Sequence, residues 1–301
     1  MRYGFIGLGN LGAKLAANLV RAGFDVTVHD LNLEAAASLI AAGAKWADTA
    51  KIVGQSVDAV FTCLPSPAVS ERVLTAEDGL LAGLASGSTW LEMSTNDQET
   101  IEQLAKIAAE HGVATLEAPI TGGVHLATSG EITIIVGGEA KTLAQHRAAL
   151  SAMGKQIFHV GPIGSASVIK VITNMLAFVH LVAAGEALML AKRGGLDLAQ
   201  AFHVIKASSG TSFVHETESR LILNGSYNIN FTIDLACKDL GFAMKLGRNF
   251  GVPLDLAALT AQTFIRAREA YGGDAWSTKV VKLLEDALRT DLRAPGFPAQ
   301  L

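Results

Sequence analysis

Cysteine, charged residues and aromatic residues are all scarce in this sequence of 301 residues. The only two cysteines, Cys63 and Cys237, lie far apart and do not have the spacing of a metal site, which favours a reducing compartment. Charged residues make up 17% of the chain and aromatic residues 6%, whereas hydrophobic residues reach 50%. We therefore expect extensive buried surface, part of it between subunits, in a chain long enough for two domains.

Positive charge is also limited, and this excludes whole classes of partner. The formal net charge is −4 and the sequence has no run of lysine or arginine, so we expect no nucleic-acid partner. The most membrane-like stretch, Met175–Ala191, contains His180 and Glu186, which favours a buried helix over a membrane span. No signal peptide precedes the first strand, and we expect a cytoplasmic protein without a membrane partner.

The sequence also lacks two kinds of catalytic pattern. No G-x-S-x-G nucleophile motif occurs in a hydrolase context. The eight histidines show no paired ligand spacing, so we predict no metal site. They are His29, His111, His125, His146, His159, His180, His203 and His215.

What the sequence does have is a glycine turn between an apolar strand and a helix. The segment Gly7-Leu8-Gly9-Asn10-Leu11-Gly12 follows Tyr3–Ile6 and precedes a helical pattern over 13–22. Gly7 permits a tight turn, Gly9 lets phosphate approach the backbone, and Gly12 lets the helix lie close to the strand. The N–H groups that open the helix favour an anion. We predict a dinucleotide site at Gly7–Gly12.

An acid at the end of the next strand indicates which dinucleotide. Asp30 lies near the offset of about 20 residues at which a carboxylate hydrogen-bonds the adenine ribose. A carboxylate suits a free 2′-hydroxyl and repels a 2′-phosphate, and the following Leu31 and Asn32 provide no arginine for such a phosphate. We predict NAD as the cofactor and NADP as the less favoured one. The alternative is an acid that caps the next helix.

Strands and helices alternate through the first half of the chain, which is typical of parallel βαβ units. Strands are expected at 3–6, 25–30, 45–47, 57–63, 89–93, 114–117 and 132–136, with helices at 13–22, 34–42, 49–54, 68–74 and 98–111.

Beyond Val160–Gly164 the pattern changes to helices alone. We expect these helices at 165–192, 197–207, 214–223, 235–250, 255–270 and 277–288. A domain boundary near residue 163 follows, giving domains 1–163 and 164–301. Because ligands of open α/β sheets bind beyond the carboxyl ends of the strands, we expect the substrate between the two halves.

Lys170 and Asn174 are unusual polar residues in an otherwise apolar helix. They lie four apart, which places them on one face of the helix. Burial disfavours the charged form of an amine and so lowers its pKa toward the range useful in proton transfer. The alternative is a lysine that extends to solvent at the domain edge, with an amide between helices.

Other candidate residues follow predicted strands. Gly122 and Gly123, preceded by Thr121, offer backbone N–H donors and a hydroxyl to a carboxylate, unless the segment is an ordinary turn. His125 lies just beyond the glycines and is a candidate for the pocket wall; the alternative, a surface histidine, is the favoured interpretation of this residue alone. Weaker candidates for cofactor contact are Leu64, Pro65, Ser94 and Thr95. Lys238 and Asp239 instead begin a helix-like run, where they either pair internally or reach the active site.

Four segments in this order resemble the β-hydroxyacid dehydrogenase family, which includes 3-hydroxyisobutyrate dehydrogenase, tartronate semialdehyde reductase and, more distantly, 6-phosphogluconate dehydrogenase. The resemblance covers essentially the whole chain. The segments are Phe5–Gly12, Glu117–Gly123, Gly161–Gly164 with Lys170 and Asn174, and Asp234–Gly241.

The resemblance implies an α/β fold, with an N-terminal Rossmann domain containing a doubly wound parallel sheet and an all-α C-terminal domain, assembled as a homodimer or homotetramer. It also implies that Lys170 is catalytic, that Asn174 and Thr121–Gly123 bind the substrate, and that Thr95 and Lys238 contact the cofactor region. This chain differs from the family pattern at Thr121, usually serine, at Thr173, often asparagine, and at His125-Leu126, where small residues are common.

We therefore predict reversible NAD-dependent oxidation of a small β-hydroxy acid to its semialdehyde or keto acid. The alternatives are an imine reductase on the same scaffold, against which Lys170 argues, and a cofactor-binding module without catalysis.

Overall fold

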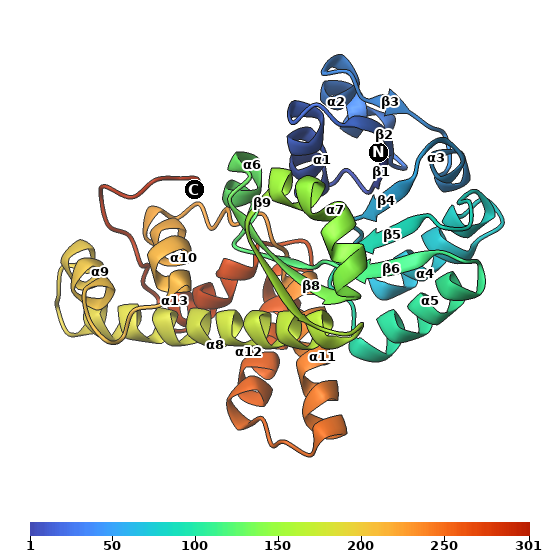
Figure 1. The fold of residues 1–301 in the computed structure, drawn as a ribbon. Coiled ribbons are helices and arrows are strands. Elements are labelled where there is room, and N and C mark those ends of the chain that lie inside the picture. Colours follow the sequence, from blue (N-terminus) through green and yellow to red (C-terminus); the bar gives the residue numbers. More distant parts are fainter. The chain divides into compact units, whose positions relative to one another are not determined.

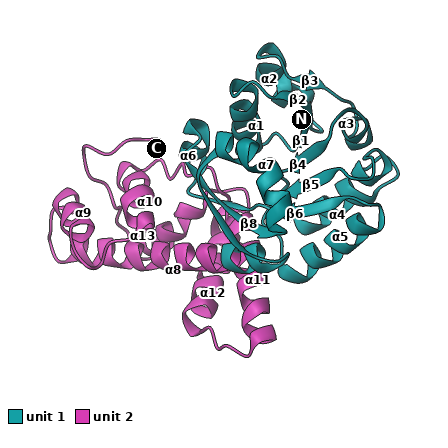
Figure 2. Cartoon of the chain, in the orientation of Figure 1, with its two compact units in different colours: residues 1–170 teal, residues 171–301 magenta.

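The computed structural model describes residues 1–301 and consists of two compact units. Unit 1 comprises Met1–Lys170 and unit 2 comprises Val171–Leu301 (Figure 2). The division falls inside the longest helix, α8 (Ser165–Arg193), whereas the sequence predicts a boundary near residue 163.

Unit 1 is built on a mixed sheet whose main part is parallel. Its parallel strands are β1 (Arg2–Ile6), β2 (Asp25–His29), β3 (Lys45–Trp46), β4 (Ala59–Thr62), β5 (Thr89–Glu92) and β6 (Ala114–Glu117). They lie in the order β3-β2-β1-β4-β5-β6, in which the order reverses beside β1. This is the order of a dinucleotide-binding doubly wound sheet, with its switch point between β1 and β4.

Helices cover both faces of this sheet (Figure 1). Alternate residues of a strand point to opposite faces, so each face has a core cluster of its own. Phe5 and Leu91 belong to one core cluster, and their neighbours Ile6 and Trp90 belong to another. The first cluster includes residues of α1 (Gly12–Arg21), α2 (Ala37–Ala41), α6 (Val124–Ser129) and α7 (Ala140–Met153), and the second includes residues of α3 (Ala50–Ser56), α4 (Pro67–Thr75) and α5 (Gln98–Glu110). Short 3-10 helices lie at Leu33–Ala36 and Leu80–Ala82.

The sheet departs from the predicted pattern beyond β6. There β8 (Ile132–Gly138) runs antiparallel to β6 and to the short β7 (Ile120–Thr121), and β9 (Gly154–Gly161) pairs with β8 in parallel. The predictions contained β8 but neither β7, α7 nor β9. The helix predicted over 34–42 begins as a 3-10 turn, in which Asn32 caps the segment through a hydrogen bond from Glu34 N of 3.0 Å.

Unit 2 is entirely helical apart from an isolated bridge between Thr232 and Trp276. Besides most of α8, it contains α9 (Leu198–Lys206), α10 (Phe213–Asn224), α11 (Ile233–Phe250), α12 (Asp255–Tyr271), the 3-10 helix Ser277–Val281 and α13 (Lys282–Ala287). One core cluster joins them, with Leu181, Phe264 and Val281 among its members. Gly185 of α8 packs so closely on Val281 that a Cβ atom would come within 2.6 Å of that side chain.

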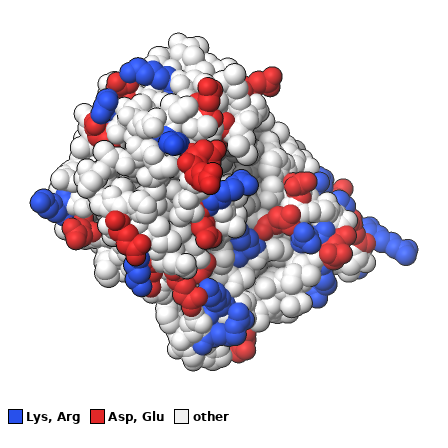
Figure 3. All heavy atoms as spheres, turned by 90° about the vertical axis from the view of Figure 1, so that its right-hand side faces the viewer, with Lys and Arg blue, Asp and Glu red and all other residues white.

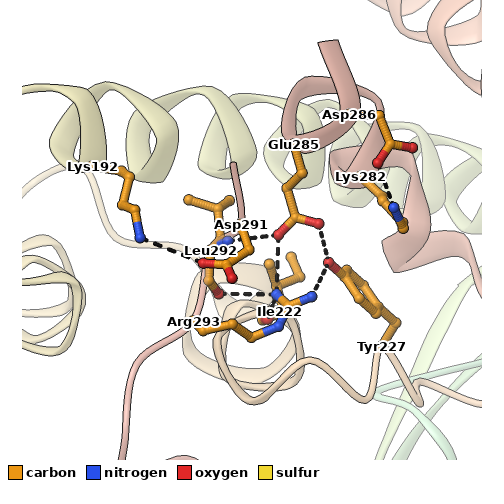
Figure 4. A network of polar contacts seen from close by, with 9 residues as sticks. All are labelled: Lys192, Ile222, Tyr227, Lys282, Glu285, Asp286, Asp291, Leu292 and Arg293. Atoms are coloured by element: carbon orange, nitrogen blue, oxygen red, sulfur yellow. Dashed lines mark hydrogen bonds and ion pairs between the residues drawn. The ribbon is translucent and has the colours of Figure 1, made fainter. Parts of the chain in front are cut away.

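The C-terminal tail is held to unit 2 by a buried carboxylate, that of Glu285 (Figure 4). Glu285 accepts hydrogen bonds from Leu292 N at 2.7 Å, from Arg293 Nη1 at 3.0 Å and from the hydroxyl of Tyr227. Arg293 also donates to the carbonyl of Ile222 at 3.0 Å. Since these bonds join the tail residues Leu292 and Arg293 to Ile222 of α10 through Arg293, the network fixes the tail after α13 against α10.

Two surface features bear on the predicted partners. Acidic and basic side chains are interspersed on the face shown in Figure 3, which therefore lacks a patch of one sign. One helix, α8, is long and apolar enough to cross a membrane by length and composition alone, and 39% of its most apolar window is buried. A core helix of a soluble protein meets the same criteria.

Candidate active site

The glycine turn after β1 has the backbone that its three glycines predict. Gly7 has φ of +93°, and a Cβ atom there would lie 2.3 Å from the Cys63 carbonyl oxygen. A Cβ atom on Gly12 would lie 1.9 Å from the Gly7 carbonyl oxygen, so that α1 can start here only with glycine. Nothing lies within 4 Å of the corresponding point at Gly9, which is exposed together with Asn10.

The start of α1 is suited to an anion. No side chain caps this helix and its first turn contains no acidic residue. The first N–H groups of a helix lack intrahelical acceptors and carry the positive end of the dipole. The open backbone at Gly9 and the uncapped helix therefore fit the pyrophosphate of a dinucleotide. Leu8 is buried and Leu11 half-buried beside them.

Asp30 follows β2 and braces the same turn. Its Oδ2 accepts the N–H of Leu8 at 2.6 Å, and its Oδ1 accepts the N–H of Asn32 at 2.9 Å. The alternative of an acid that caps the next helix is therefore not observed, because Asn32 is the cap. Leu31 is 90% exposed, and no cation stands beside Asp30 in this segment to receive a 2′-phosphate.

Three further candidates lie at the ends of β4, which is next to β1 in the sheet, and of β5, which is next to β4. Leu64 and Thr95 are half-buried and Pro65 is exposed. The N–H of Leu64 donates to Ser94 Oγ at 2.7 Å, which ties the two strand ends together. Ser94 N in turn donates to the buried Glu92 at 2.7 Å, and burial raises the pKa of the Glu92 carboxyl.

The loop predicted to bind a carboxylate depends on two consecutive glycines. Gly122 has φ of +124° and Gly123 has φ of +89°, conformations that other residues rarely adopt. They connect β7, which ends at Thr121, to α6. His125, in the first turn of α6, is half-buried, and burial lowers the pKa of its imidazole. Its ring lies so close to Gly123 that a Cβ atom there would meet it at 3.2 Å.

Lys170 lies in the second turn of α8 and is 7% exposed. The alternative of a lysine that extends to solvent is therefore wrong. The start of its helix is fixed by Glu117, which ends β6 and accepts hydrogen bonds from Ala166 N at 2.8 Å and Ser167 N at 2.9 Å. Because Glu117 also begins the loop to Gly123, it joins the helix of Lys170 to the loop.

In unit 2, Asp239 connects two of the predicted site residues. Its buried carboxylate accepts Asn174 Nδ2 at 2.6 Å and pairs with Lys238 Nζ at 2.7 Å. The Lys238 amine also lies 4.9 Å from the centre of the Phe242 ring. The internal partner considered for Lys238 is thus present. Asp239 is not among the predicted site residues. The sequence feature that indicates it is its position directly after Lys238.

Among all described residues there is no group of three or more His, Cys, Asp or Glu side chains that is arranged to hold a metal ion.

Comparison with known proteins places these segments in a family. Residues 2–161 match the family model described as the NAD binding domain of 6-phosphogluconate dehydrogenase. Residues 164–284 match the one described as NAD-binding of NADP-dependent 3-hydroxyisobutyrate dehydrogenase.

Curated relatives are similar over most of their length. The chain is 32% identical to 2-(hydroxymethyl)glutarate dehydrogenase of Eubacterium barkeri, over 95% of both chains. It is 36% identical to NAD-dependent L-serine dehydrogenase of Pseudomonas aeruginosa, over 80% of this chain and 83% of that one. It is 35% identical to 3-hydroxyisobutyrate dehydrogenase of the same organism, over 86% and 90%.

Among solved structures, 3-hydroxyisobutyrate dehydrogenase from Salmonella typhimurium has a TM-score of 0.87 at 29% identity, covering 94% of this chain and 99% of that one. An imine reductase from Streptomyces aurantiacus has a TM-score of 0.61 at 21% identity, over 94% and 99%, which reflects a shared fold alone. The doubly wound sheet with its glycine turn, the all-helical second unit and these relatives lead to one conclusion: the chain belongs to the β-hydroxyacid dehydrogenase family and is an NAD-dependent hydroxyacid dehydrogenase.

Proposed function

We propose that this enzyme interconverts a small β-hydroxy acid, similar to 3-hydroxyisobutyrate, and its semialdehyde or keto acid, with Lys170 as general acid and base. One observation carries the proposal. The Lys170 amine is held in a buried environment at the start of a helix that is anchored to the strand leading into the Thr121–Gly123 loop. In this proposal the proton-transfer group and the carboxylate-binding loop are joined through Glu117, within unit 1.

Each residue then has a chemical role. The backbone N–H groups of Gly122 and Gly123 and the hydroxyl of Thr121 hold the substrate carboxylate. Gly7–Gly12 and Asp30 would hold NAD, which would supply the acceptor for the hydride that leaves the carbinol carbon. Lys170 takes the hydroxyl proton as the alcohol becomes a carbonyl, and it returns a proton in reduction.

Asn174 lies one helical turn beyond Lys170 and binds the substrate from the same helix face. Its amide donates to Asp239, which fixes the orientation of the side chain and aims the amide oxygen away from that carboxylate. Lys238, held by the same carboxylate, belongs to the cofactor region in this proposal.

The chemistry that the named relatives share supports the proposed substrate class. 2-(Hydroxymethyl)glutarate, L-serine and 3-hydroxyisobutyrate all have a hydroxyl on the carbon β to a carboxylate. We place His125 at the wall of the pocket, where its neutral imidazole, favoured by burial, selects among the groups on the intervening carbon. We propose the cytoplasm as the compartment, in keeping with two free thiols, Cys63 and Cys237.

A substrate panel tests the function. The purified enzyme is supplied with NAD and, in turn, 3-hydroxyisobutyrate, L-serine, L-threonate and 4-hydroxybutyrate, while NADH absorbance is followed. We expect NADH formation with at least one of the β-hydroxy acids at a higher kcat/KM than with 4-hydroxybutyrate. NADPH-dependent reduction of cyclic imines without any hydroxy-acid oxidation would overturn the proposal.

The role of Lys170 is tested by Lys170→Ala. Removal of a general acid and base lowers the rate by about 10²–10⁴-fold, and we expect kcat to fall in this range. NADH affinity, measured by fluorescence titration, should remain within about threefold, because the glycine turn is untouched.

Lys206→Ala is the matched control, since Lys206 pairs with Glu216 on the surface of unit 2. We expect normal kcat for this variant. Near-normal kcat for Lys170→Ala would show that another group transfers the proton.

A further inference from the structure

The buried carboxylate of Glu117 has no role in the proposed reaction, yet both of its oxygens accept hydrogen bonds. It is the last residue of β6 and is 1% exposed. One oxygen accepts Ala166 N at 2.8 Å, and the other accepts both Ser167 N at 2.9 Å and Ser167 Oγ at 2.7 Å. All of these donors belong to the first turn of α8. A carboxylate at this position also complements the positive end of the helix dipole.

A glycine on the neighbouring strand leaves room for this carboxylate. Gly137 of β8 pairs with Glu117 across the antiparallel ladder. A Cβ atom on Gly137 would lie 2.2 Å from Glu117 Oε1, so any larger residue would displace the carboxylate. Burial raises the pKa of the Glu117 carboxyl, and the hydrogen bonds from Ser167 and Ala166 act against this shift. The site is therefore built around the anchored carboxylate.

The anchored turn leads directly to Lys170. Lys170 follows Ser167 by three positions and Ala166 by four, so it lies on the same helix face, about 5 Å further along the axis. The backbone of Glu117 also begins the loop that ends at Gly123. A single side chain thus fixes the helix that carries the amine relative to the loop that receives the substrate carboxylate.

We propose that Glu117 is a positioning residue of the reaction, which sets the distance between the Lys170 amine and the Thr121–Gly123 loop. The inference rests on the proposed role of Lys170. A displacement of about 1 Å at a reacting group costs about 10²-fold in rate, so a looser first turn of α8 affects turnover before it affects cofactor binding.

A double-mutant cycle between Glu117→Gln and Lys170→Ala tests this inference. Glutamine keeps the length of the side chain but replaces one acceptor oxygen by an NH₂ group, which cannot accept from Ala166 or Ser167. With the best hydroxy acid of the panel, we expect Glu117→Gln to lower kcat about 10–100-fold and to change KM for NAD less than about twofold. In the Lys170→Ala background the same change should lower the residual kcat less than about twofold, because no amine remains to be positioned.

Glu285→Gln is the matched control for loss of stability. Glu285 is another buried glutamate that accepts a backbone N–H, in this case that of Leu292, and it lies in unit 2 (Figure 4). We expect it to lower Tm while kcat at 25 °C stays unchanged. If Glu117→Gln also lowers Tm but leaves kcat unchanged at 25 °C, or lowers kcat equally in both backgrounds, the positioning role is wrong.

Failure of the proposed function has a different signature, namely near-normal kcat in Lys170→Ala alone. Where Glu117→Gln does not fold, Ser167→Ala is used in its place, since it removes one of the three hydrogen bonds and leaves the backbone donors intact. A fall in kcat of about two- to fivefold that disappears in the Lys170→Ala background supports the inference. An unchanged kcat in Ser167→Ala overturns it.

Discussion

Asp30 has two functions that a single carboxylate can combine. One oxygen is bonded to Leu8 N inside the glycine turn, and the other to Asn32 N in the following segment. These bonds hold the carboxylate at the end of β2, where each oxygen still has a lone pair for a ribose hydroxyl. We expect the same charge to repel a 2′-phosphate, so that in our proposal cofactor choice and the shape of the turn would depend on one residue.

Substitution of Asp30 should therefore alter both affinity and cofactor choice. Asp30→Ala removes hydrogen bonds to a charged group, each worth about 1.5–3 kcal/mol, so KM for NAD should rise about 10–100-fold. The ratio of kcat/KM for NADP to that for NAD should rise at least about tenfold. Steady-state kinetics with both cofactors measures these changes.

Asp25→Ala is the control for this prediction, because Asp25 lies on the same strand but pairs with Lys45 at the surface. It should leave the cofactor ratio unchanged. Wild-type enzyme that uses NADP more efficiently than NAD would contradict the role given to Asp30.

The residues that the sequence could predict are those whose partners lie nearby in the chain. Gly7, Gly9 and Gly12 form one local turn, and their conformations follow from the absence of a Cβ atom. Glu117 was part of a recognised segment, but its donors lie 49 and 50 positions away, and only the fold brings them together. Asp239 is similar, since Asn174 is 65 positions distant. Sequence motifs are defined by short spacings, so they do not predict pairs of residues this far apart in the chain.

Among the elements, predictions succeeded where hydrophobic periodicity was strong and failed where it was weak. The parallel strands β1 to β6 alternate with helices, and each was expected within a few residues of its observed bounds. Helix α7 mixes polar and apolar residues without a clear stripe, and β9 is mostly exposed on one edge of the sheet. The alternation of apolar and polar residues does not indicate the direction of a strand, so the sequence does not predict the antiparallel pairing of β8.

The missed helix α7 contains a titratable group that should make stability depend on pH. His146 is buried, its Nδ1 lies 3.2 Å from the hydroxyl of Tyr3 on β1, and burial lowers its pKa from 6.5 to about 4. Between these two values the unfolded chain binds more protons than the folded one, so stability falls as the pH is lowered from 6.5 toward 4. The full effect corresponds to about 3 kcal/mol.

Comparison of His146→Phe with the wild type isolates this contribution, because other groups titrate equally in both. We expect the difference in free energy of unfolding, measured with urea between pH 4 and pH 7.5, to shift in favour of the variant below about pH 6.5. His111→Gln, at an exposed histidine, should show no such change. Parallel pH profiles for wild type and His146→Phe would mean that His146 is not held in its neutral form.

At the scale of the whole chain, the two halves could be predicted because they differ in periodicity. Alternating strands and helices give way to helices alone after Gly164, and each unit has core clusters of its own. The two matched family models meet between residues 161 and 164, near the predicted boundary at 163, whereas the compact units divide at Lys170. The position of the predicted boundary remains a prediction, because the compact units divide inside α8 and not at residue 163.

Helix α8 has exposed apolar side chains in addition to those that it buries in the core of unit 2. Leu181 and Leu188 point into that core, whereas Ile172, Leu176 and Leu190 are exposed on the same helix. Leu190 is 76% exposed. Apolar side chains left in water on a long helix are typical of a surface that another subunit covers. We therefore expect the homodimer or homotetramer predicted from the sequence, with α8 contributing to its interface.

Light scattering coupled to gel filtration tests this expectation. The wild type should have a mass of two or four times 31.4 kDa without detergent. Leu190→Lys places a charge on the apolar face, and because burial of an unpaired charge is costly, the assembly should dissociate into smaller species at micromolar concentration. Ile40→Lys, an equally drastic change at an exposed apolar residue of α2 in unit 1, should leave the mass unchanged. A wild type of 31.4 kDa, or a Leu190→Lys variant with an undiminished mass, would show that a second copy of the chain does not cover this face of α8.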